Sequence, residues 1–271
     1  MSTVIETHDL RKTYGATTAL DGLDLTVPEG EVHGFLGPNG AGKSTTIRIL
    51  LGLTRADSGT ATVLGGDPWR EATDLHRRMA YVPGDVALWP NLTGGETIDL
   101  LARLRGGMDE RRRRDLVERF DLDPTKKARS YSKGNRQKVA LIAALASDAP
   151  LLLLDEPTAG LDPIGAAAFD RLTRELQDTL GLTVFLITHD LDTLHEICDR
   201  VAVIADKRVI AVDTVPNLMK LDHPWIQEYF NGPRGRAALT AQALDELRRH
   251  MDQPIAAHAV KALDNINGKQ A

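Results

Sequence analysis

The sequence predicts an α/β fold with a mixed β-sheet, an antiparallel β-portion near the N-terminus and a helical subdomain. Continuous apolar runs at Leu151–Leu154 and Leu182–Thr188 are typical of parallel strands that are buried on both faces. The segment Gly165–Leu180 between them has the length and pattern of a connecting helix. The glycine-rich stretch Gly37–Thr45 lies between an apolar strand and a helical segment, which indicates a phosphate-binding loop and hence a P-loop core.

Turn-forming residues separate the elements that are expected in the first third of the chain. Pro28-Glu29-Gly30 divides two early strands, and Ser58-Gly59 precedes a later one. The predicted elements are strands at Val4–Glu6, Leu20–Val27 and Glu31–Leu36, a helix at Gly42–Leu51, and strands at Thr60–Leu64 and Arg78–Pro83.

Residues from about Leu92 to Ser147 differ from their surroundings because they are mostly helical in pattern and rich in arginine. We therefore expect a helical subdomain at about 85–150, inserted between strands of the sheet. A dense basic cluster, Arg111–Arg114, has acidic residues on both sides. A solvated helix face explains this cluster better than a nucleic-acid contact.

The C-terminal part of the chain has a weaker pattern. Strands at Val201–Ala205 and Lys207–Val212 complete the sheet. The expected organisation is one nucleotide-binding domain over residues 1–222 and a helical extension over residues 223–271. The extension has the pattern of two short amphipathic helices, the first over Thr240–Met251. Because such helices are marginal alone in water, we expect them to dock on the core or on a second copy of the chain.

Composition limits the classes of function. The net charge of −5 gives no general electrostatic reason to bind nucleic acid or an acidic membrane. Cys198 is the only cysteine, which excludes an intramolecular disulfide and fits a reducing compartment. The first residues lack the pattern of a signal peptide, and no run approaches about 18 apolar residues. We therefore expect a cytoplasmic protein, for which any transport role requires a pore formed by a separate polypeptide.

The predicted phosphate-binding loop supplies several ligands for a nucleoside triphosphate. Its glycines let backbone N–H groups surround the β-phosphate, and the helix beginning near Gly42 directs its positive end at the same phosphates. Lys43 reaches the β and γ oxygens, and Ser44 offers its hydroxyl to Mg²⁺. The residues expected to bind the nucleotide here are Gly37, Pro38, Asn39, Gly40, Ala41, Gly42, Lys43, Ser44 and Thr45.

Two carboxylates follow the apolar strand that ends at Leu154. Asp155 is expected to help Ser44 hold Mg²⁺, and Glu156 is expected to polarise the attacking water. A strand before the loop, a helix after it and two carboxylates downstream argue against a chance match. The sequence therefore predicts the hydrolysis of a nucleoside triphosphate with Mg²⁺.

Further motifs narrow the class of P-loop protein. They are Tyr131–Lys138 between the two nucleotide motifs, Ala159–Asp162 after the carboxylates, and Thr188–Asp190 after the next strand. With these motifs in order over roughly residues 3–222, the chain resembles the ATP-binding cassette (ABC) ATPase family. The resemblance implies ATP as the nucleotide and Mg²⁺ as its metal.

The resemblance also implies roles for single residues. Tyr14 matches the aromatic residue that stacks on adenine, and Asp162 matches the loop that couples two sites across a dimer. Ser132 and Gly134 match the signature motif, which contacts the γ-phosphate held by a partner subunit. The resemblance further implies that two such domains close head-to-tail over two ATP molecules, and that transmembrane permease subunits convert this cycle into transport at the inner face of the cell membrane. The matching hydrolytic residues are Asp155 as the Mg²⁺ carboxylate, Glu156 as the catalytic base and His189 as the switch histidine.

Simpler explanations exist for three of these residues. Tyr14 would also suit the surface beside a turn. Asp162 precedes a proline and would also suit the start of a helix as its N-cap, a role compatible with the first. His189 alone would suit a structural role, but its place after a buried strand and before Asp190 favours the switch.

The chain departs from the family pattern at two places. The family usually has a glutamine where this chain has Gly84, so Asp85 or water is left to replace it. The signature motif is usually Leu-Ser-Gly-Gly-Gln, whereas Tyr131, Lys133 and Asn135 stand here at its first, third and fifth positions. A contact of Lys133 with the partner's γ-phosphate and a solvent-facing lysine are both consistent with the motif.

A third departure concerns the subfamily. The section from Met1 to about Asp162 resembles bacterial drug-exporter ATPases of the actinobacterial kind. The section from about Ala166 to Ala238 instead resembles phospholipid-trafficking ATPases of the Gram-negative envelope. The join would fall near Pro163–Gly165, and a natural mosaic, a designed chimera and a divergent member all fit it.

The sequence thus predicts the ATP-hydrolysing subunit of a bacterial ABC transporter that drives drug or lipid export through separate membrane subunits, paired with itself or with another ATPase subunit. No nucleic-acid partner is expected. The alternative is a non-transport ABC ATPase acting on ribosomes or DNA, but such proteins usually carry two cassettes or a long insertion. An inactive regulatory or binding module is disfavoured because the hydrolytic residues are all present, namely Lys43, Asp155, Glu156 and His189.

Overall fold

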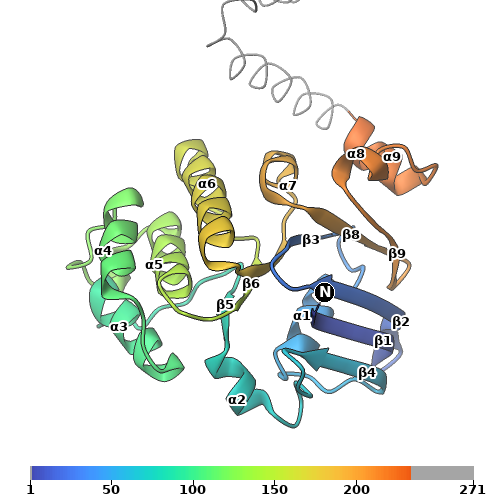
Figure 1. Ribbon diagram of the computed structural model, residues 1–271, viewed down its shortest axis with the longest axis horizontal. Helices are drawn as coiled ribbons and strands as arrows, with labels where there is room; N and C mark the ends of the chain where they lie inside the picture. Colours follow the sequence, from blue (N-terminus) through green and yellow to red (C-terminus); the bar gives the residue numbers. More distant parts are fainter. Residues whose placement is uncertain (1, 233–271) are drawn as a thin grey trace, which may run out of the picture. The chain divides into compact units, whose positions relative to one another are not determined.

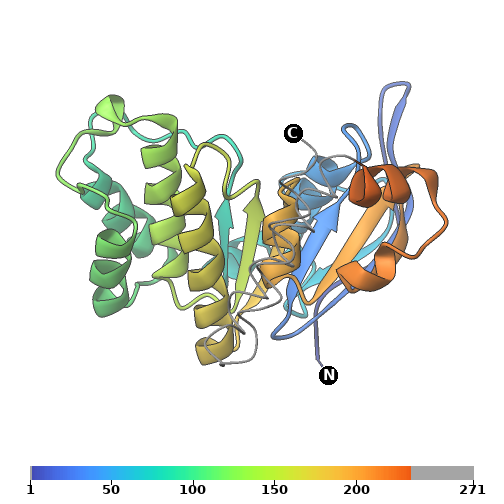
Figure 2. The ribbon, with the colours of Figure 1, turned by 90° about the horizontal axis from the view of Figure 1, so that it is seen from above.

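The computed structural model describes residues 2–232, and Figure 1 and Figure 2 show its ribbon. The chain divides into two compact units, Met1–Val215 and a second that starts at Pro216 and is described to residue 232. None of the described helices is long and apolar enough to cross a membrane. The tail helix predicted around Thr240–Met251 and the rest of the predicted extension beyond residue 232 lie outside the described residues.

A six-stranded mixed sheet forms the centre of the first unit (Figure 1), which confirms the predicted fold class. The strand order is β5-β6-β7-β3-β8-β9, and all neighbours pair in parallel except β9, which is antiparallel to β8. Because parallel strands end at the same edge of a sheet, the carboxyl ends of β3, β6 and β7 lie next to one another. The bounds are β3 Val32–Leu36, β5 Met79–Val82, β6 Leu151–Asp155, β7 Thr183–Ile187, β8 Arg200–Ala205 and β9 Arg208–Asp213.

A second, antiparallel sheet is built from the N-terminal segment in the order β2-β1-β4. Strand β1 is much longer than the predicted Val4–Glu6, because it pairs with β2 along most of its length and also with β4. Asp9 has a φ of 45°, and the register of β1 shifts between Thr7 and Leu10. This irregularity interrupts the alternation of apolar and polar residues and hides the second half of the strand in the sequence. The bounds are β1 Thr3–Tyr14, β2 Thr17–Pro28 and β4 Ser58–Val63.

The sequence predicts the long helices better than the short ones. Helix α6 is 18 residues long and begins at its N-cap Asp162, whose side chain accepts a hydrogen bond from the backbone N–H of Gly165 at 2.8 Å. The short helices α2 and α7 have six and seven residues, too few for a clear apolar period, and the sequence did not predict them. The helices outside the predicted subdomain are α1 Lys43–Leu50, α2 Ala72–Arg77, α6 Pro163–Leu180, α7 Leu191–Ile197, α8 Val215–Leu218 and α9 Pro224–Asn231.

All the elements described between β5 and β6 are helices (Figure 2). Thr93 and Glu96 form a reciprocal capping box at the start of α3, and Asp109 caps α4 by accepting from the backbone N–H groups of two residues in its first turn. Capping fixes where these helices begin, because it satisfies backbone donors that have no partner inside the helix. The bounds are α3 Gly94–Arg105, α4 Glu110–Arg119, the 3₁₀ helix Ala128–Ser130 and α5 Lys133–Leu145.

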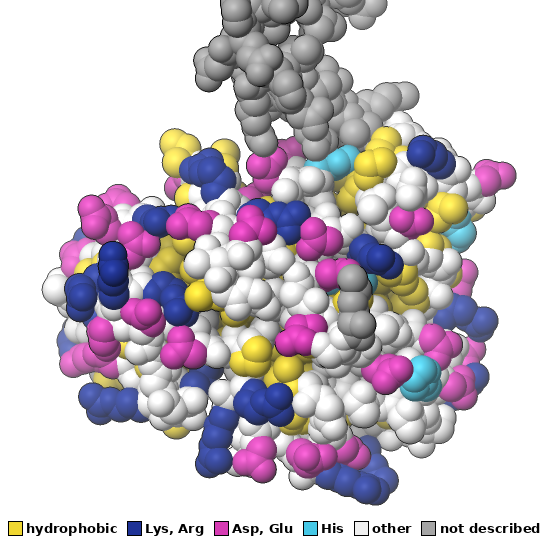
Figure 3. Space-filling model, in the orientation of Figure 1, with side chains coloured by type: hydrophobic (Ala, Val, Ile, Leu, Met, Phe, Trp, Pro, Cys, Tyr) yellow, Lys and Arg dark blue, Asp and Glu magenta, His cyan; other side chains and the backbone are white. Residues whose placement is uncertain are grey.

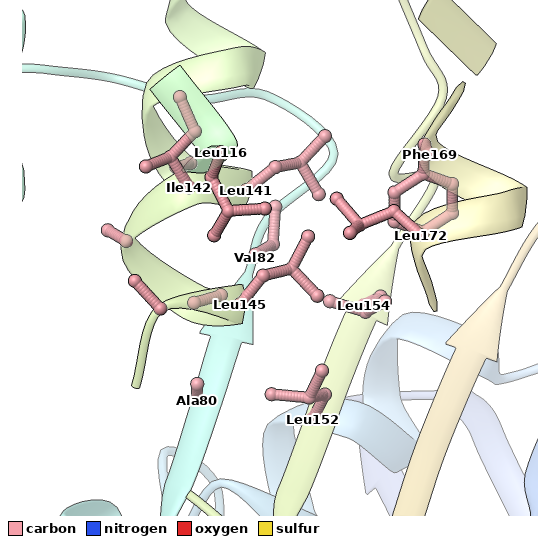
Figure 4. Close-up of a cluster of buried hydrophobic side chains, with 14 of the residues drawn as sticks. Ala80, Val82, Leu116, Leu141, Ile142, Leu145, Leu152, Leu154, Phe169 and Leu172 are labelled. Carbon is pink, nitrogen blue, oxygen red and sulfur yellow. The ribbon is translucent and has the colours of Figure 1, made fainter. Parts of the chain in front are cut away.

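One hydrophobic cluster ties these helices to the sheet (Figure 4). Strands β5 and β6 direct one row of side chains toward α4, α5 and α6. Phe169 of α6 and Leu154 of β6 are fully buried in this cluster. The labelled members of the cluster are Ala80, Val82, Leu116, Leu141, Ile142, Leu145, Leu152, Leu154, Phe169 and Leu172. Burial of this row therefore holds β6, and the carboxylates at its end, in a fixed position.

The arginine cluster Arg111–Arg114 lies on α4. Arg112 Nη1 donates to the carbonyl oxygen of Ser147 at 2.8 Å, and Arg113 Nη2 lies 2.9 Å from Asp99 Oδ1 on α3. The expectation of a wholly solvated face is therefore wrong for these two arginines, because their guanidinium groups fix α4 to its neighbours. The outer two are exposed, and acidic and basic side chains are interspersed over the face shown in Figure 3.

A buried polar contact joins α6 and α7. Asp170 on α6 is 6% exposed, and its Oδ2 accepts a hydrogen bond from Thr193 Oγ1 at 3.2 Å. Its other oxygen is buried with no hydrogen-bond partner among the described residues. Burial, assisted by the nearby charges of Asp190, Glu196 and Asp192, raises the pKa of Asp170 to about 7. The group therefore changes charge near neutral pH beneath the helix that follows His189.

Replacing Asp170 by asparagine should make the free energy of unfolding less dependent on pH. The folded chain keeps the proton up to about pH 7, whereas the unfolded chain loses it near about pH 4. Stability from this group is therefore lost as pH rises through that window. Between pH 5 and pH 8 we expect the stability of Asp170→Asn relative to wild type to increase by about 2 kcal/mol.

Thermal melting at the two pH values measures this difference. Asp178→Asn, an exposed position of the same helix, is the control and should show no such increase. An equal difference between Asp170→Asn and wild type at both pH values would contradict the raised pKa.

Candidate nucleotide-binding and hydrolysis site

A cavity of about 390 Å³ opens at the carboxyl ends of β3, β6 and β7. Three segments that are distant in the sequence meet there: the loop after β3, the end of β6 and the segment after β7. Strand β7 lies between the other two in the sheet, so parallel pairing alone brings them together. The lining residues are Thr17, Thr18, Ala19, Asn39, Gly40, Gly42, Lys43, Ser44, Thr45, Asp155, Glu156, Ile187, His189 and Lys207.

The loop at residues 37–45 packs closely against the neighbouring strands β2 and β8. Gly42 has a φ of 119°, and a Cβ there would lie 2.6 Å from a side-chain carbon of Leu20. A Cβ at Gly37 would lie 2.2 Å from the carbonyl oxygen of Ile204. Only glycine fits either position, so the loop can bring its backbone N–H groups toward a bound phosphate at the start of α1.

Lys43 is nearly buried at the floor of the cavity. Its Nζ donates hydrogen bonds to the carbonyl oxygens of Gly37 at 2.6 Å and Pro38 at 3.1 Å. Burial lowers the pKa of Lys43, and the nearby charges of Glu156 and Asp155 oppose that shift. A phosphate oxygen is a stronger hydrogen-bond acceptor for this ammonium group than the two neutral carbonyl oxygens.

Asp155, the last residue of β6, and Glu156 line the same cavity. Burial raises the pKa of both carboxyl groups, against the nearby charge of Lys43. Glu156 has a φ of 48°, an uncommon conformation for a residue with a side chain. Its backbone N–H donates to the carbonyl oxygen of Ile187 at 2.8 Å, which holds the strained residue at the strand end.

His189 contacts Glu156 in two ways. The backbone N–H of His189 donates to Glu156 Oε2 at 3.3 Å, and His189 Nε2 lies 3.5 Å from Oε1. Burial, followed by the charge of Lys43, lowers the pKa of His189 and so favours the neutral ring. The predicted base and the predicted switch histidine therefore lie together.

The donor atoms in the cavity fit a small, hard cation. The Ser44 hydroxyl and the Asp155 carboxylate both line the cavity. Mg²⁺ prefers oxygen ligands and usually takes one or two from protein, with water and phosphate supplying the others. These two residues are the ones that could hold it beside the phosphates.

The signature residues lie elsewhere. Ser132 caps α5 by accepting from the backbone N–H of Asn135 at 3.2 Å, and a Cβ at Gly134 would lie 2.5 Å from the carbonyl oxygen of Gly160. Neither Ser132 nor Gly134 is among the described residues that line the cavity. In Figure 1 and Figure 2, α5 and α1 lie on different sides of β6. One chain therefore does not bring its signature residues to its own phosphate-binding loop.

Tyr14, Gly84 and Asp85 are not among the described residues that line the cavity. Tyr14 ends β1, is 45% exposed, and has the Lys12 ammonium 5.3 Å from its ring centroid. A Cβ at Gly84 would lie 3.2 Å from the carbonyl oxygen of Asp155, whereas Asp85 is exposed. Gly84, where the family usually has a glutamine, is thus adjacent to the carboxylates but has no side chain with which to contact them.

Sequence reasoning missed several residues that line the cavity. Thr17, Thr18 and Ala19 begin β2, ahead of the strand start predicted at Leu20. Lys207 lies in the turn before β9, although the sequence predicted it as the first residue of a strand. A signal for this turn was present, since Asp206 and Lys207 are polar residues between two apolar runs.

Comparison with protein-family models and curated proteins gives consistent matches. The family model described as ABC transporter matches residues 20–159. The daunorubicin/doxorubicin resistance ATP-binding protein DrrA of Streptomyces peucetius is 42% identical over 219 residues, which cover 79% of this chain and 66% of that protein. The bacitracin transport ATP-binding protein BcrA of Bacillus licheniformis is 32% identical over 247 residues, which cover 90% of this chain and 81% of that protein.

Solved structures agree with this result. The ATP-binding subunit of an ABC transporter matches with a TM-score of 0.75 and 30% identity, covering 84% of this chain and 98% of that one. A dimeric post-hydrolysis state of the ATP-binding cassette MJ0796, bound to ADP and Pi, matches with a TM-score of 0.70 and 27% identity, covering 78% and 98%.

Lys43→Ala should weaken ATP binding by about 10²-fold, because it removes a charge-assisted contact to two phosphates. The chain should still fold, since the loop lies outside the hydrophobic core, at the edge of the sheet where the cavity opens. Titration with a fluorescent ATP analogue measures the affinity, and thermal melting measures the fold. The exposed Lys126→Ala is the charge-matched control, and an unchanged affinity of Lys43→Ala would count against the assignment.

Proposed function

The chain belongs to the ABC transporter ATPase family, and on this premise we propose that it hydrolyses Mg²⁺–ATP to drive drug export through separate membrane subunits. The observation that carries the proposal is the single cavity lined by Lys43, Asp155 and Glu156. The names of the relatives refer to daunorubicin/doxorubicin resistance and bacitracin transport, which supports a drug as the cargo.

The phosphate-binding loop and five polar residues of the site have separate roles in the proposed reaction. The loop and Lys43 bind the phosphates, while Ser44 and Asp155 would hold Mg²⁺, which neutralises charge on the β and γ oxygens when bound. Water attacks the γ-phosphorus, the bond to the bridging oxygen breaks, and Glu156 accepts the proton from the water. The products are ADP and inorganic phosphate. The contact of His189 with Glu156 keeps that carboxylate oriented toward the attacking water.

The working unit of the proposal is a head-to-tail dimer. Ser132 and Gly134 lie outside the cavity of their own chain, so they are free to complete the cavity of a second chain. The start of α5 would present its backbone N–H groups to the γ-phosphate bound there. A dimeric cassette among the solved relatives supports this arrangement.

A separate groove is the proposed contact with the membrane subunit. It has a volume of about 520 Å³ and lies between α2, β5 and α3. Leu53 and Leu104 in its lining are 62% and 67% exposed, an unusual exposure for large apolar side chains. An amphipathic helix of a permease would cover them. Strand β5 leads from this groove to Gly84 beside Asp155, which offers a route from the membrane contact to the carboxylates.

Other cargoes and activities are less well supported. A lipid-like compound is the second candidate cargo, on the sequence-based interpretation of the section from about Ala166 alone, since none of the relatives named above is a phospholipid-trafficking protein. A non-transport role on ribosomes or DNA has less support, because the net charge is −5 and the relatives named above are resistance or transport ATP-binding proteins.

Glu156→Gln should bind ATP like wild type but lose about 10²-fold or more in turnover, because glutamine cannot accept the proton from water. Without hydrolysis, the ATP-bound dimer should persist. Phosphate release measures turnover, and light scattering with ATP and Mg²⁺ measures the dimer.

The control is Glu118→Gln, an exposed glutamate on α4 outside the cavity. It should retain the turnover of wild type. Wild-type turnover in Glu156→Gln would reject Glu156 as the base. Failure of the wild-type chain to co-purify with any membrane-spanning protein would reject the transport role.

A further inference from the structure

The turn between β8 and β9 brings a second lysine into the nucleotide cavity. Lys207 lines the cavity, and its Nζ donates a hydrogen bond to the carbonyl oxygen of Gly40 in the phosphate-binding loop. Lys207 and Lys43 are the cationic side chains among the described lining residues. No family motif named above includes Lys207.

The backbone at this turn is unusual for the residues that form it. Asp206 and Lys207 have φ values of 48° and 68°, in the left-handed region that glycine adopts most readily. The backbone N–H of Asp21 donates to the carbonyl oxygen of Lys207 at 3.0 Å, which anchors the turn to β2. The turn is therefore fixed in place, and it delivers a charged side chain where glycine would fit with less strain.

A phosphate oxygen can replace the Gly40 carbonyl oxygen as the hydrogen-bond acceptor for Lys207. A neutral carbonyl oxygen is a weaker partner for an ammonium group than a phosphate oxygen. The space in front of Gly40 is open, since a Cβ built there would meet nothing within 4 Å. A phosphate in the cavity thus has room beside Gly40, within reach of a flexible lysine side chain.

The strand order indicates which phosphate this is. Strand β3, which carries the loop, lies between β7 and β8 in the sheet. Asp155 and Glu156 lie on the β7 side of the loop, whereas Lys207 enters from the β8 side. Hydrolysis places the γ-phosphate near the carboxylates, so Lys207 lies toward the nucleoside end of the phosphate chain.

We propose that Lys207 is a second nucleotide-binding cation, which leaves the Gly40 carbonyl oxygen and binds an α-phosphate oxygen when nucleotide enters. This inference rests on the proposed function of the cavity. In this assignment Lys43 binds the β- and γ-phosphates and Lys207 binds the α-phosphate. Because the α-phosphate does not change during hydrolysis, Lys207 stabilises the bound substrate and the transition state equally.

The test compares Lys207→Gln and Lys207→Arg with wild type, using ATP and ADP as separate ligands. Lys207→Gln should weaken both nucleotides by about the same factor, on the order of tenfold. The KM for ATP should rise by a similar factor while kcat stays unchanged. Lys207→Arg keeps the charge and should retain most of the affinity.

Arg208→Gln is the matched control. Arg208 is the next residue in the chain, carries the same charge, and its Nη2 lies 3.6 Å from Asp21 Oδ2. It does not line the cavity, so its affinity for ATP and ADP should equal that of wild type. Lys207→Gly removes the side chain while its glycine adopts the left-handed backbone without strain. It should therefore keep an intact melting transition and bind nucleotides as weakly as Lys207→Gln.

Two results would overturn the inference. Equal affinities of Lys207→Gln and wild type would show that the lysine only caps the Gly40 carbonyl. A loss confined to ATP would place the contact on the γ-phosphate instead. A wild-type chain that binds neither nucleotide would contradict the proposed function itself, which is a different failure from either of these.

Discussion

Parallel pairing of β3, β7 and β6 is the constraint on which the site depends. The register pairs Ile187 and Asp155, the last residues of β7 and β6, and pairs Ile187 also with Phe35, one residue before the end of β3. The carboxyl ends of the three strands therefore lie side by side. Since each strand end is followed directly by a functional segment, the loop, the carboxylates and His189 reach the cavity without long connections. The buried row of Leu152, Leu154 and Phe169 then prevents β6 from slipping relative to its neighbours.

The charged groups in the cavity depend on one another. Burial destabilises the charged form of Lys43, Asp155 and Glu156 alike, and the attraction between the lysine and the two carboxylates offsets part of that cost. The proposed metal–triphosphate complex would also bring both signs of charge, its cation facing the carboxylates and its phosphates facing the lysine.

Much of this site could be predicted from the sequence because its chemistry is carried by contiguous residues. A phosphate-binding loop must be glycine-rich, and the pair Asp155-Glu156 must end a buried strand, so both are visible as local patterns. Lys207 could not be predicted in the same way, because only tertiary structure brings a turn near residue 207 to Gly40. Similarly, the bulge at Asp9 hid half of β1, and α7 has too few residues to show a helical period.

The proposed head-to-tail dimer follows from one observation, that Ser132 and Gly134 are not among the described residues lining the cavity that contains Lys43. The most direct test is magnesium-dependent phosphate release from ATP, measured as specific activity over a wide range of protein concentrations. If two chains must close over the nucleotide, specific activity rises with concentration until the dimer saturates, and it disappears when Mg²⁺ is chelated. A specific activity that is the same at all concentrations would contradict this account.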